Sequence, residues 1–198
     1  MKHRAHLATK ESNHLLCLAS ACLLLPLTQS PPVAKADMLL NGSFAKDLKP
    51  WVLEESGAKG EVMVAHDRPD RGSSVKIRVV SVGDKPWRLQ LYQGGLTIQK
   101  GAKYELTYWV KAAKAGVITV NCMQNHEPWE HHGAASELPV TTKWKELKFA
   151  FTGPWDDTNA RITFTNLGTV PGQTYWFAQC SLKQVSSNYS EPSKEMWR

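Results

Sequence analysis

The chain has 198 residues, with 24 Lys and Arg against 18 Asp and Glu and a formal net charge of +6. This length suffices for one well-buried domain and is too short for two ordinary domains. Four of the 24 basic residues and one of the 18 acidic residues lie in residues 1–36, so the remainder carries 20 against 17, or +3, and nucleic acid is not an expected partner.

The first 36 residues have the pattern of a secretory signal peptide. Basic residues precede an apolar run from Leu15 to Leu27, and Ala34-Lys35-Ala36 has the small residues of a cleavage site. The apolar run is shorter than the roughly 20 residues that a membrane-spanning helix needs. We therefore expect cleavage near Ala36, export to the periplasm or the extracellular space, no membrane span and a monomeric product.

Residues 37–184 are predicted to form one domain of short strands. Runs of alternating apolar and polar residues are separated by turns that contain Gly and Pro. The expected strands cover residues 51–54, 61–65, 74–80, 88–93, 104–112, 117–123, 145–152, 161–165 and 174–184. This regular series predicts an all-β jelly-roll β-sandwich of two antiparallel sheets, followed by a flexible polar tail over residues 185–198.

Three of these strands combine an apolar face with a polar face, because successive side chains in a strand point to opposite sides. The strand at 117–123 also continues into a polar loop that ends in an aromatic residue. The polar positions of the strands and the loop are Arg88, Gln90, Tyr92, Thr119, Asn121, Asn125, His126, Trp129, Arg161, Thr163 and Thr165. A sugar presents C–H groups on its ring faces and hydroxyls at its rim, so aromatic rings beside amide and guanidinium groups favour sugar binding.

A series of motifs follows in a fixed order along residues 40–183. They include Asn41-Gly-Ser-Phe44, Trp87-x-Leu-Gln-Leu-x-Gln93, Ile98-x-x-Gly-x-x-Tyr104-x-Leu-x-Tyr108-Trp109, Phe149-x-Phe151-Thr, Ala160-Arg-Ile-x-Phe164, Leu167-Gly168 and Tyr175-Trp-Phe-x-x-x-Ser-Leu182. No single motif is specific. Their order and spacing resemble the carbohydrate-binding modules of families 4, 9 and 22, which are associated with cellulases and xylanases.

The resemblance implies a secreted, non-catalytic module whose concave sheet forms a cleft for a single polysaccharide chain of the β-glucan or xylan type. It adds two positions to the polar faces, Val52 and Glu54, where Glu54 stands at a position that is often aromatic in the family. Trp129 follows Pro128 in the polar loop and is expected to contact the ligand. The other tryptophans in or beside apolar strand patterns are expected to be mostly core residues: Trp51, Trp87, Trp109, Trp144 and Trp176.

No metal or cofactor is expected. Many members of the resembled family hold a structural calcium ion, but Ala45 and Ala178-Gln179 stand where the family usually has carboxylates. The His- and Glu-rich run 126–132 lacks the helical spacing of a zinc motif and is expected to be a hydrogen-bonding rim loop, and Asp156-Asp157 is expected to form a solvated turn.

Cys122 and Cys180 leave two alternatives open. A pair of cysteines in an oxidising compartment can form a disulfide, whereas cysteines on the inner faces of two different sheets lie about 10 Å apart, beyond bridging distance.

Two other functions remain as alternatives. A hydrolase or lyase on the same scaffold would need paired carboxylates, for which Glu54 with Glu127 or Glu130 are the candidates. A module that binds protein or the cell envelope would use the same face for a different partner.

Overall fold

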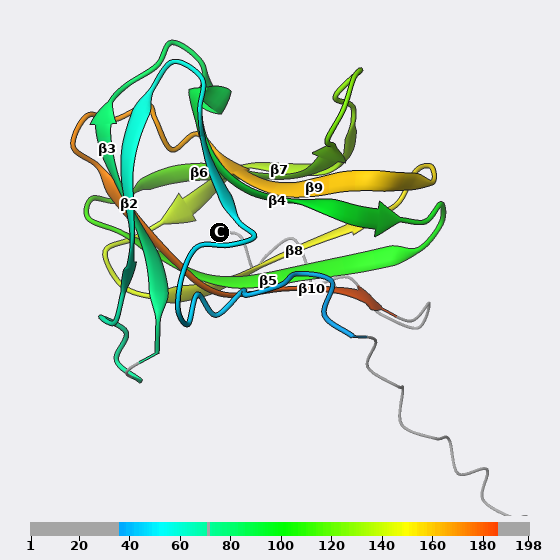
Figure 1. The fold of residues 1–198 in the computed structure, drawn as a ribbon, viewed down its shortest axis with the longest axis horizontal. Helices are drawn as coiled ribbons and strands as arrows, with labels where there is room; N and C mark the ends of the chain where they lie inside the picture. Colours follow the sequence, from blue (N-terminus) through cyan, green and yellow to red (C-terminus); the bar gives the residue numbers. More distant parts are fainter. Residues whose placement is uncertain (1–35, 71, 186–198) are drawn as a thin grey trace, which may run out of the picture. The chain divides into compact units, whose positions relative to one another are not determined.

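The computed structural model describes residues 36–70 and 72–185, which form two five-stranded antiparallel sheets (Figure 1). Sheet A has the strand order β1-β4-β9-β6-β7, and sheet B has the order β2-β3-β10-β5-β8. The strands are β1 (Val52–Glu55), β2 (Lys59–Ala65), β3 (Ser74–Ser81), β4 (Leu89–Ile98), β5 (Lys103–Ala112), β6 (Gly116–Gln124), β7 (His131–Val140), β8 (Lys145–Thr152), β9 (Asp157–Thr165) and β10 (Thr174–Val185), with the short 3₁₀ turn η1 (Pro86–Arg88) before β4. The predicted all-β sandwich is confirmed.

All nine expected strands are present, and β7 is an additional one. The sequence of β7 contains Gly133, Ala134, Ala135 and Pro139, which are poor strand formers. It nevertheless forms because it is an edge strand that pairs only with β6, where a proline costs no hydrogen bond to a second neighbour. The expectation that the whole of 126–132 is a loop was therefore wrong at His131 and His132.

The two sheets pack face to face around an aromatic core. Phe164 of β9 lies at its centre, with its ring centroid 4.9 Å from that of Tyr108 and 4.6 Å from that of Phe177, both of which belong to sheet B. Trp51 adds a stacked ring at 6.1 Å. These contacts place Ile162 and Phe164 inward, so the intervening side chains of β9 lie on the outer face of sheet A.

Only Trp51 of the five tryptophans expected in the core is buried there. Trp87 is 51% exposed on η1, so its assignment to the core was wrong. Trp109, Trp144 and Trp176 are half-buried rather than core residues. Their placement was wrong because cations, not apolar side chains, cover their rings.

The rings of Trp109, Trp144 and Trp176 alternate with the side chains of Arg68 and Lys111. These residues belong to sheet B and the loops beside it. The Nζ atom of Lys111 lies 4.6 Å from the ring centroid of Trp176 and 5.0 Å from that of Trp144. The guanidinium of Arg68 lies 5.7 Å from the Trp144 ring and 5.5 Å from the Trp109 ring. Cation–π contact and the aliphatic stems of these side chains thus shield the indoles from water.

Cys122 of β6 and Cys180 of β10 are buried free thiols in different sheets. Of the two alternatives, the structure shows the unbridged one. Burial raises the pKa of both thiols, so neither forms a thiolate near neutral pH. Among the described residues, no helix is long and apolar enough to cross a membrane.

The segment before β1 is fixed to both sheets. The amide of Gln93 bonds the Leu40 backbone on both sides, accepting from its N–H at 2.7 Å and donating to its carbonyl at 2.8 Å. On sheet B, the Cys180 N–H donates to the Gly42 carbonyl at 3.0 Å. Gly42 lies so close to β10 that a Cβ atom there would be 1.8 Å from the Cys180 carbonyl oxygen.

We expect Gly42→Ala to lower the free energy of unfolding by about 3 kcal/mol, because the added methyl group meets backbone that has to move. Gly116→Ala is the matched control, since its added Cβ would have no neighbour closer than 3.8 Å, and we expect a change of no more than about 1 kcal/mol. Urea denaturation followed by tryptophan fluorescence measures both. Equal midpoints for the two variants would contradict the close approach of Gly42 to β10.

Candidate functional site

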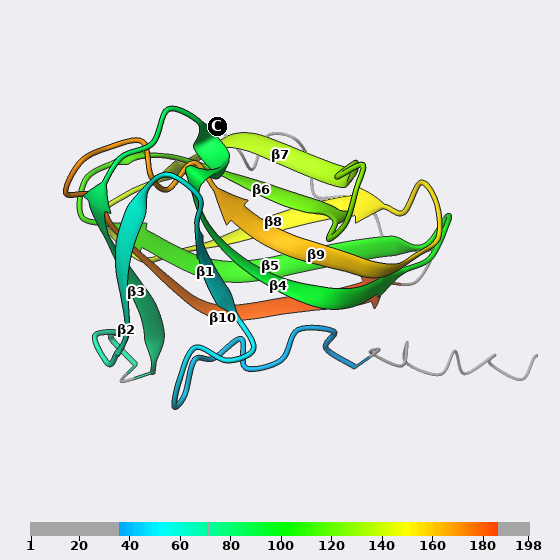
Figure 2. The same ribbon diagram turned by 45° about the horizontal axis from the view of Figure 1, so that its top comes forward.

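The outer face of sheet A collects the polar side chains of four adjacent strands. Tyr92 of β4 lies opposite Val52 of β1 and Thr163 of β9, and Thr163 lies opposite Asn121 of β6. Figure 2 turns this side of sheet A toward the viewer. Two further pairs of partners extend the same face, Glu54 with Gln90 and Thr119 with Thr165. The strand register therefore brings together residues separated by more than 100 positions in the sequence.

Amide and hydroxyl groups form the floor of this face. Gln90, Asn121, Thr163 and Thr165 are all buried. The Thr163 hydroxyl donates to Oε1 of Gln90 at 3.0 Å, which fixes the orientation of that amide. Oδ1 of Asn121 is buried and has no hydrogen-bond partner in the structure. An unsatisfied buried acceptor is costly, so this atom is a candidate to accept a hydrogen bond from a ligand.

Arg161 of β9 connects the floor to two aromatic rings. Its Nη1 donates to Oε2 of Glu54 at 3.2 Å. Its Cζ atom lies 4.8 Å from the ring centroid of Tyr92 and 5.3 Å from that of Trp129. The side chain is only 9% exposed, and Nη2 also contacts the sulfur of Met123 at 3.8 Å. Arg161 thus holds the position of both rings through one buried guanidinium.

The connection between β6 and β7 carries Trp129, which is 45% exposed. The Trp129 N–H donates to the His126 carbonyl at 2.9 Å and closes a tight turn, while the Asn125 N–H donates to the Asn159 carbonyl at 2.9 Å. In Figure 1 this connection rises from the side of sheet A that faces away from sheet B. Trp129 is therefore presented to solvent on the same side as the amide floor.

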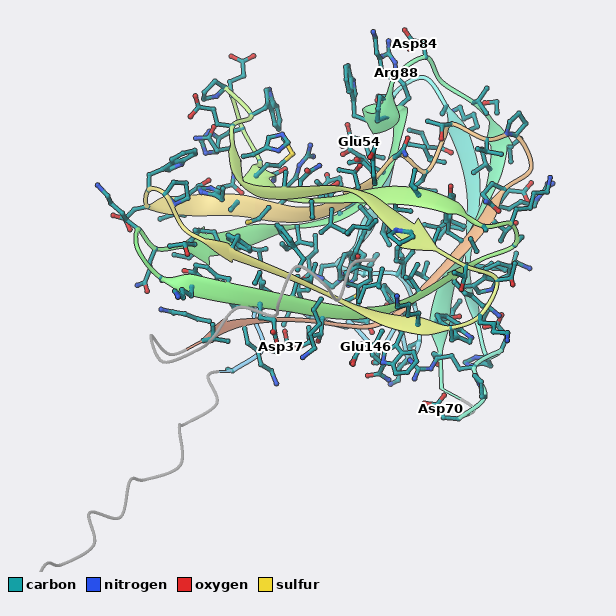
Figure 3. The ribbon with its side chains drawn as sticks, turned by 180° about the vertical axis from the view of Figure 1, so that it is seen from behind. Asp37, Glu54, Asp70, Asp84, Arg88 and Glu146 are labelled. Atoms are coloured by element: carbon teal, nitrogen blue, oxygen red, sulfur yellow. The ribbon has the colours of Figure 1, made fainter. Side chains whose placement is uncertain are left out.

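Arg88 does not join this group. It ends η1 rather than beginning β4, and its guanidinium donates to Asp84 at 2.8 Å and to the Ser56 carbonyl at 2.8 Å. Figure 3 shows Arg88 beside Asp84, with Glu54 on the outer side of sheet A between η1 and the β6–β7 connection. The expected alternation of Arg88 with Leu89 was wrong because the 3₁₀ turn changes the direction of the chain.

Trp87 is a further candidate for ligand contact, although its sequence pattern had predicted a core residue. It lies on η1, which rises on the same side of sheet A as the β6–β7 connection (Figures 1 and 3). A signal for its exposure was present, because Pro86-Trp87 follows a polar turn in the same way as Pro128-Trp129. Two exposed indoles thus occur on segments that rise beside the floor.

His126 and His132 both contact Asp157, which begins β9. Nε2 of His132 lies 2.8 Å from one carboxylate oxygen, and Nε2 of His126 lies 3.5 Å from the other. Burial acts to raise the pKa of Asp157, but hydrogen bonds from His132, the Asn159 N–H and His126 outweigh it and hold the pKa below its ordinary value. The expectation of a solvated turn at Asp157 was wrong, because the side chain is buried against the edge strand β7.

The structure offers poor ligands for calcium at the positions where the family resemblance places them. Ala45 and Ala178 carry no oxygen in their side chains, and the Ala45 N–H instead donates to Oδ1 of Asn41 at 3.3 Å. Calcium prefers several carboxylates among six to eight oxygen ligands. Over residues 36–70 and 72–185, moreover, no group of three or more His, Cys, Asp and Glu side chains is arranged to hold a metal ion.

In the part of the chain that the structure describes, two antiparallel sheets packed face to face, with the short turn η1 as the one helical element, define a jelly-roll β-sandwich. Residues 36–168 match the sequence family described as a carbohydrate binding domain, and the chain belongs to this family of carbohydrate-binding modules. A comparison with curated protein sequences gave no match.

Solved structures with the same fold include other modules of this kind. A domain described under "CBM4 structure and function" is 24% identical, with a TM-score of 0.63 over 74% of this chain and 99% of that one. The second N-terminal cellulose-binding domain of Cellulomonas fimi β-1,4-glucanase C is 18% identical, with a TM-score of 0.59 over 76% and 95%. The CBM22-1 xylan-binding domain from Paenibacillus barcinonensis Xyn10C is 15% identical, with a TM-score of 0.52 over 73% and 92%. At these identities the similarity shows the shared fold.

We expect Asp157→Asn to lower the pKa of His126. A hydrogen bond to the Glu127 carbonyl, and then the contacts with Asp157, raise the pKa of His126 above its ordinary 6.5. The charged form is thereby favoured in the folded state, so this contribution to stability is complete below pH 6.5 and is lost as the pH rises through the folded-state pKa. An NMR titration of the imidazole should give a midpoint above 6.5 in the wild type and a lower one in the variant. Identical midpoints would contradict the contact.

Proposed function

We propose that the protein binds a single polysaccharide chain of the β-glucan or xylan type on the outer face of sheet A and carries out no reaction on it. The observation that carries this proposal is the arrangement of Tyr92 and Trp129 around Arg161, beside a floor of buried amides. Aromatic rings take the C–H faces of a sugar, and the amides of Gln90 and Asn121 take its hydroxyls. Family membership supports the sugar-binding role, and the cellulose- and xylan-binding relatives support this choice of glycans.

Affinity is expected to be modest. Each hydrogen bond adds a net contribution of about 1 kcal/mol, and immobilising a flexible chain opposes binding, so we expect a Kd on the order of micromolar to millimolar. Thr119, Thr165, Val52, Asn125 and His126 supply further contacts along the face in this proposal.

The absence of catalysis is supported by the state of Glu54. A glycosidase needs one carboxyl group that is free to donate a proton and a second one across the bond to be cleaved. Glu54 instead pairs with the guanidinium of Arg161 at 3.2 Å. The hydrogen bond from Arg161 thus occupies a carboxylate oxygen that an acid catalyst would need to present to the substrate.

The proposal includes export of a monomer. Residues 1–35, in which most of the expected signal peptide falls, and the tail after Val185 lie outside the described residues. The signal-like pattern at the N-terminus supports a secreted protein that meets polysaccharide outside the cytoplasm. Detection of a chain beginning at Asp37 in the medium or periplasm would establish this part of the proposal.

We expect Tyr92→Ala and Trp129→Ala each to weaken polysaccharide binding about tenfold, because each removes a ring that stacks on sugar. Affinity electrophoresis in gels containing β-glucan, xylan, mannan or no polymer measures this as lost retardation. Met63→Ala is the control, since Met63 is an exposed apolar residue of sheet B. If the folded wild type is not retarded by any of these polymers, the proposal fails and a protein partner becomes the better hypothesis.

Calcium is expected to have no effect on stability. Addition of 5 mM CaCl₂ or of EDTA should leave the Tm of the protein unchanged, because Ala45, Ala178 and Gln179 replace the carboxylates of the usual site. If the calcium concentration were about a hundred times the Kd of a specific site, binding would add about 2.7 kcal/mol to the free energy of unfolding and raise the Tm by several degrees. Differential scanning fluorimetry measures this shift, and a rise of that size would show that other oxygens bind the ion.

A further inference from the structure

The pair between Glu54 and Arg161 lies where a bound sugar would pass. Its two partners come from β1 and β9, and the guanidinium is within 5.3 Å of both ring centroids that are proposed to stack on sugar. The two partners differ in exposure, because the Arg161 side chain is 9% exposed and the Glu54 side chain is 37% exposed. Solvent, and therefore a ligand, meets the carboxylate of the pair more readily than the guanidinium.

The negative charge of Glu54 opposes the approach of an anionic ligand to this face. His131 is a basic group near Arg161, and partial desolvation and the charge of Arg161 lower its pKa from the ordinary 6.5, which favours the neutral imidazole. A sugar carboxylate that approached Arg161 would compete with Glu54 for the guanidinium and would also be repelled by the charge of Glu54. Repulsion between like charges at a binding face is an effective means of rejecting a wrong ligand.

We propose that Glu54 is a specificity-determining residue that restricts this face to uncharged polysaccharides by occupying Arg161 and so excluding chains of uronic acids. This inference rests on the function proposed above and adds the basis of its charge selectivity. A neutral sugar has no such conflict, because it needs only the rings and the amide floor.

Replacing Glu54 by Gln should reverse the selectivity. Glutamine has nearly the same shape and keeps an oxygen that can accept from Arg161, but the buried guanidinium loses its counter-charge. A uronate carboxylate can then provide that charge and form a charge-assisted hydrogen bond. We expect Glu54→Gln to bind polygalacturonate at least about tenfold more tightly than the wild type does, which is the size expected of one such bond, and this gain should disappear in high salt.

The test is affinity electrophoresis of the full chain in gels that contain a neutral β-glucan, polygalacturonate or no polymer, at equal ionic strength. Glu61→Gln is the matched control, because Glu61 forms a similar pair with Arg78 on sheet B, with Nε 3.0 Å from Oε2. Circular dichroism verifies folding, and Glu54→Ala is measured in parallel in case the glutamine variant does not fold. Adding Arg161→Gln to Glu54→Gln should abolish the gain.

The outcomes separate the two proposals. The inference is supported if Glu54→Gln or Glu54→Ala gains retardation by polygalacturonate while Glu61→Gln behaves as the wild type. It is overturned if the folded Glu54 variants gain nothing, if Glu61→Gln gains as much, or if the wild type already binds polygalacturonate as tightly as glucan. Failure of every protein to bind the neutral polymer would instead reject the proposed function, whatever the charged polymer shows.

Discussion

The site depends on the alternation of side chains along β9. Ile162 and Phe164 point into the sandwich, where Phe164 contacts two rings of sheet B and the ring of Trp51, which precedes β1, and this fixes the strand in register and rotation. Arg161, Thr163 and Thr165 must then lie on the outer face, because a strand cannot turn one set of residues inward without turning the other outward. Strands β4 and β6 pair with β9 on either side and add their own polar positions to the same face. The core thus positions the candidate site without touching it.

A buried cation is costly unless its charge is balanced, and Arg161 meets this cost through Glu54 and two aromatic rings. The consequence is that Tyr92 and Trp129 are already oriented before any ligand arrives, which reduces the conformational entropy lost on binding. On sheet B, cations that are paired with carboxylates also contact aromatic rings, but there they shield the rings from water. There, Arg68 and Lys111 pair with Asp70 and Asp67, and together they cover three indoles. The face of sheet A differs from this one in having buried amides between its rings.

Period-2 alternation predicts most of the strands and explains why residues such as Gln90, Asn121 and Thr163 share a face. It says less about features that depend on distant partners. The strand β7 has poor strand formers and exists because β6 offers a free edge, and Asp157 is buried because His132 of that unpredicted strand contacts it. Trp87 looks like a core residue by composition, and only its position on a 3₁₀ turn exposes it. The covering of Trp176 by Lys76 and Lys111 likewise follows from strand pairing, which no single segment encodes.

Chemical-shift mapping tests whether glycan binds the outer face of sheet A. A ¹⁵N-labelled sample is titrated with soluble β-glucan and xylan oligosaccharides while backbone and side-chain amide signals are followed. We expect the largest perturbations at Gln90, Asn121 and the indole N–H of Trp129, with little change at Trp109, Trp144 and Trp176. Perturbations concentrated on Trp109, Trp144 and Trp176, with the amides of Gln90 and Asn121 unaffected, would place glycan binding on the opposite face and rule out the outer face of sheet A as the binding site.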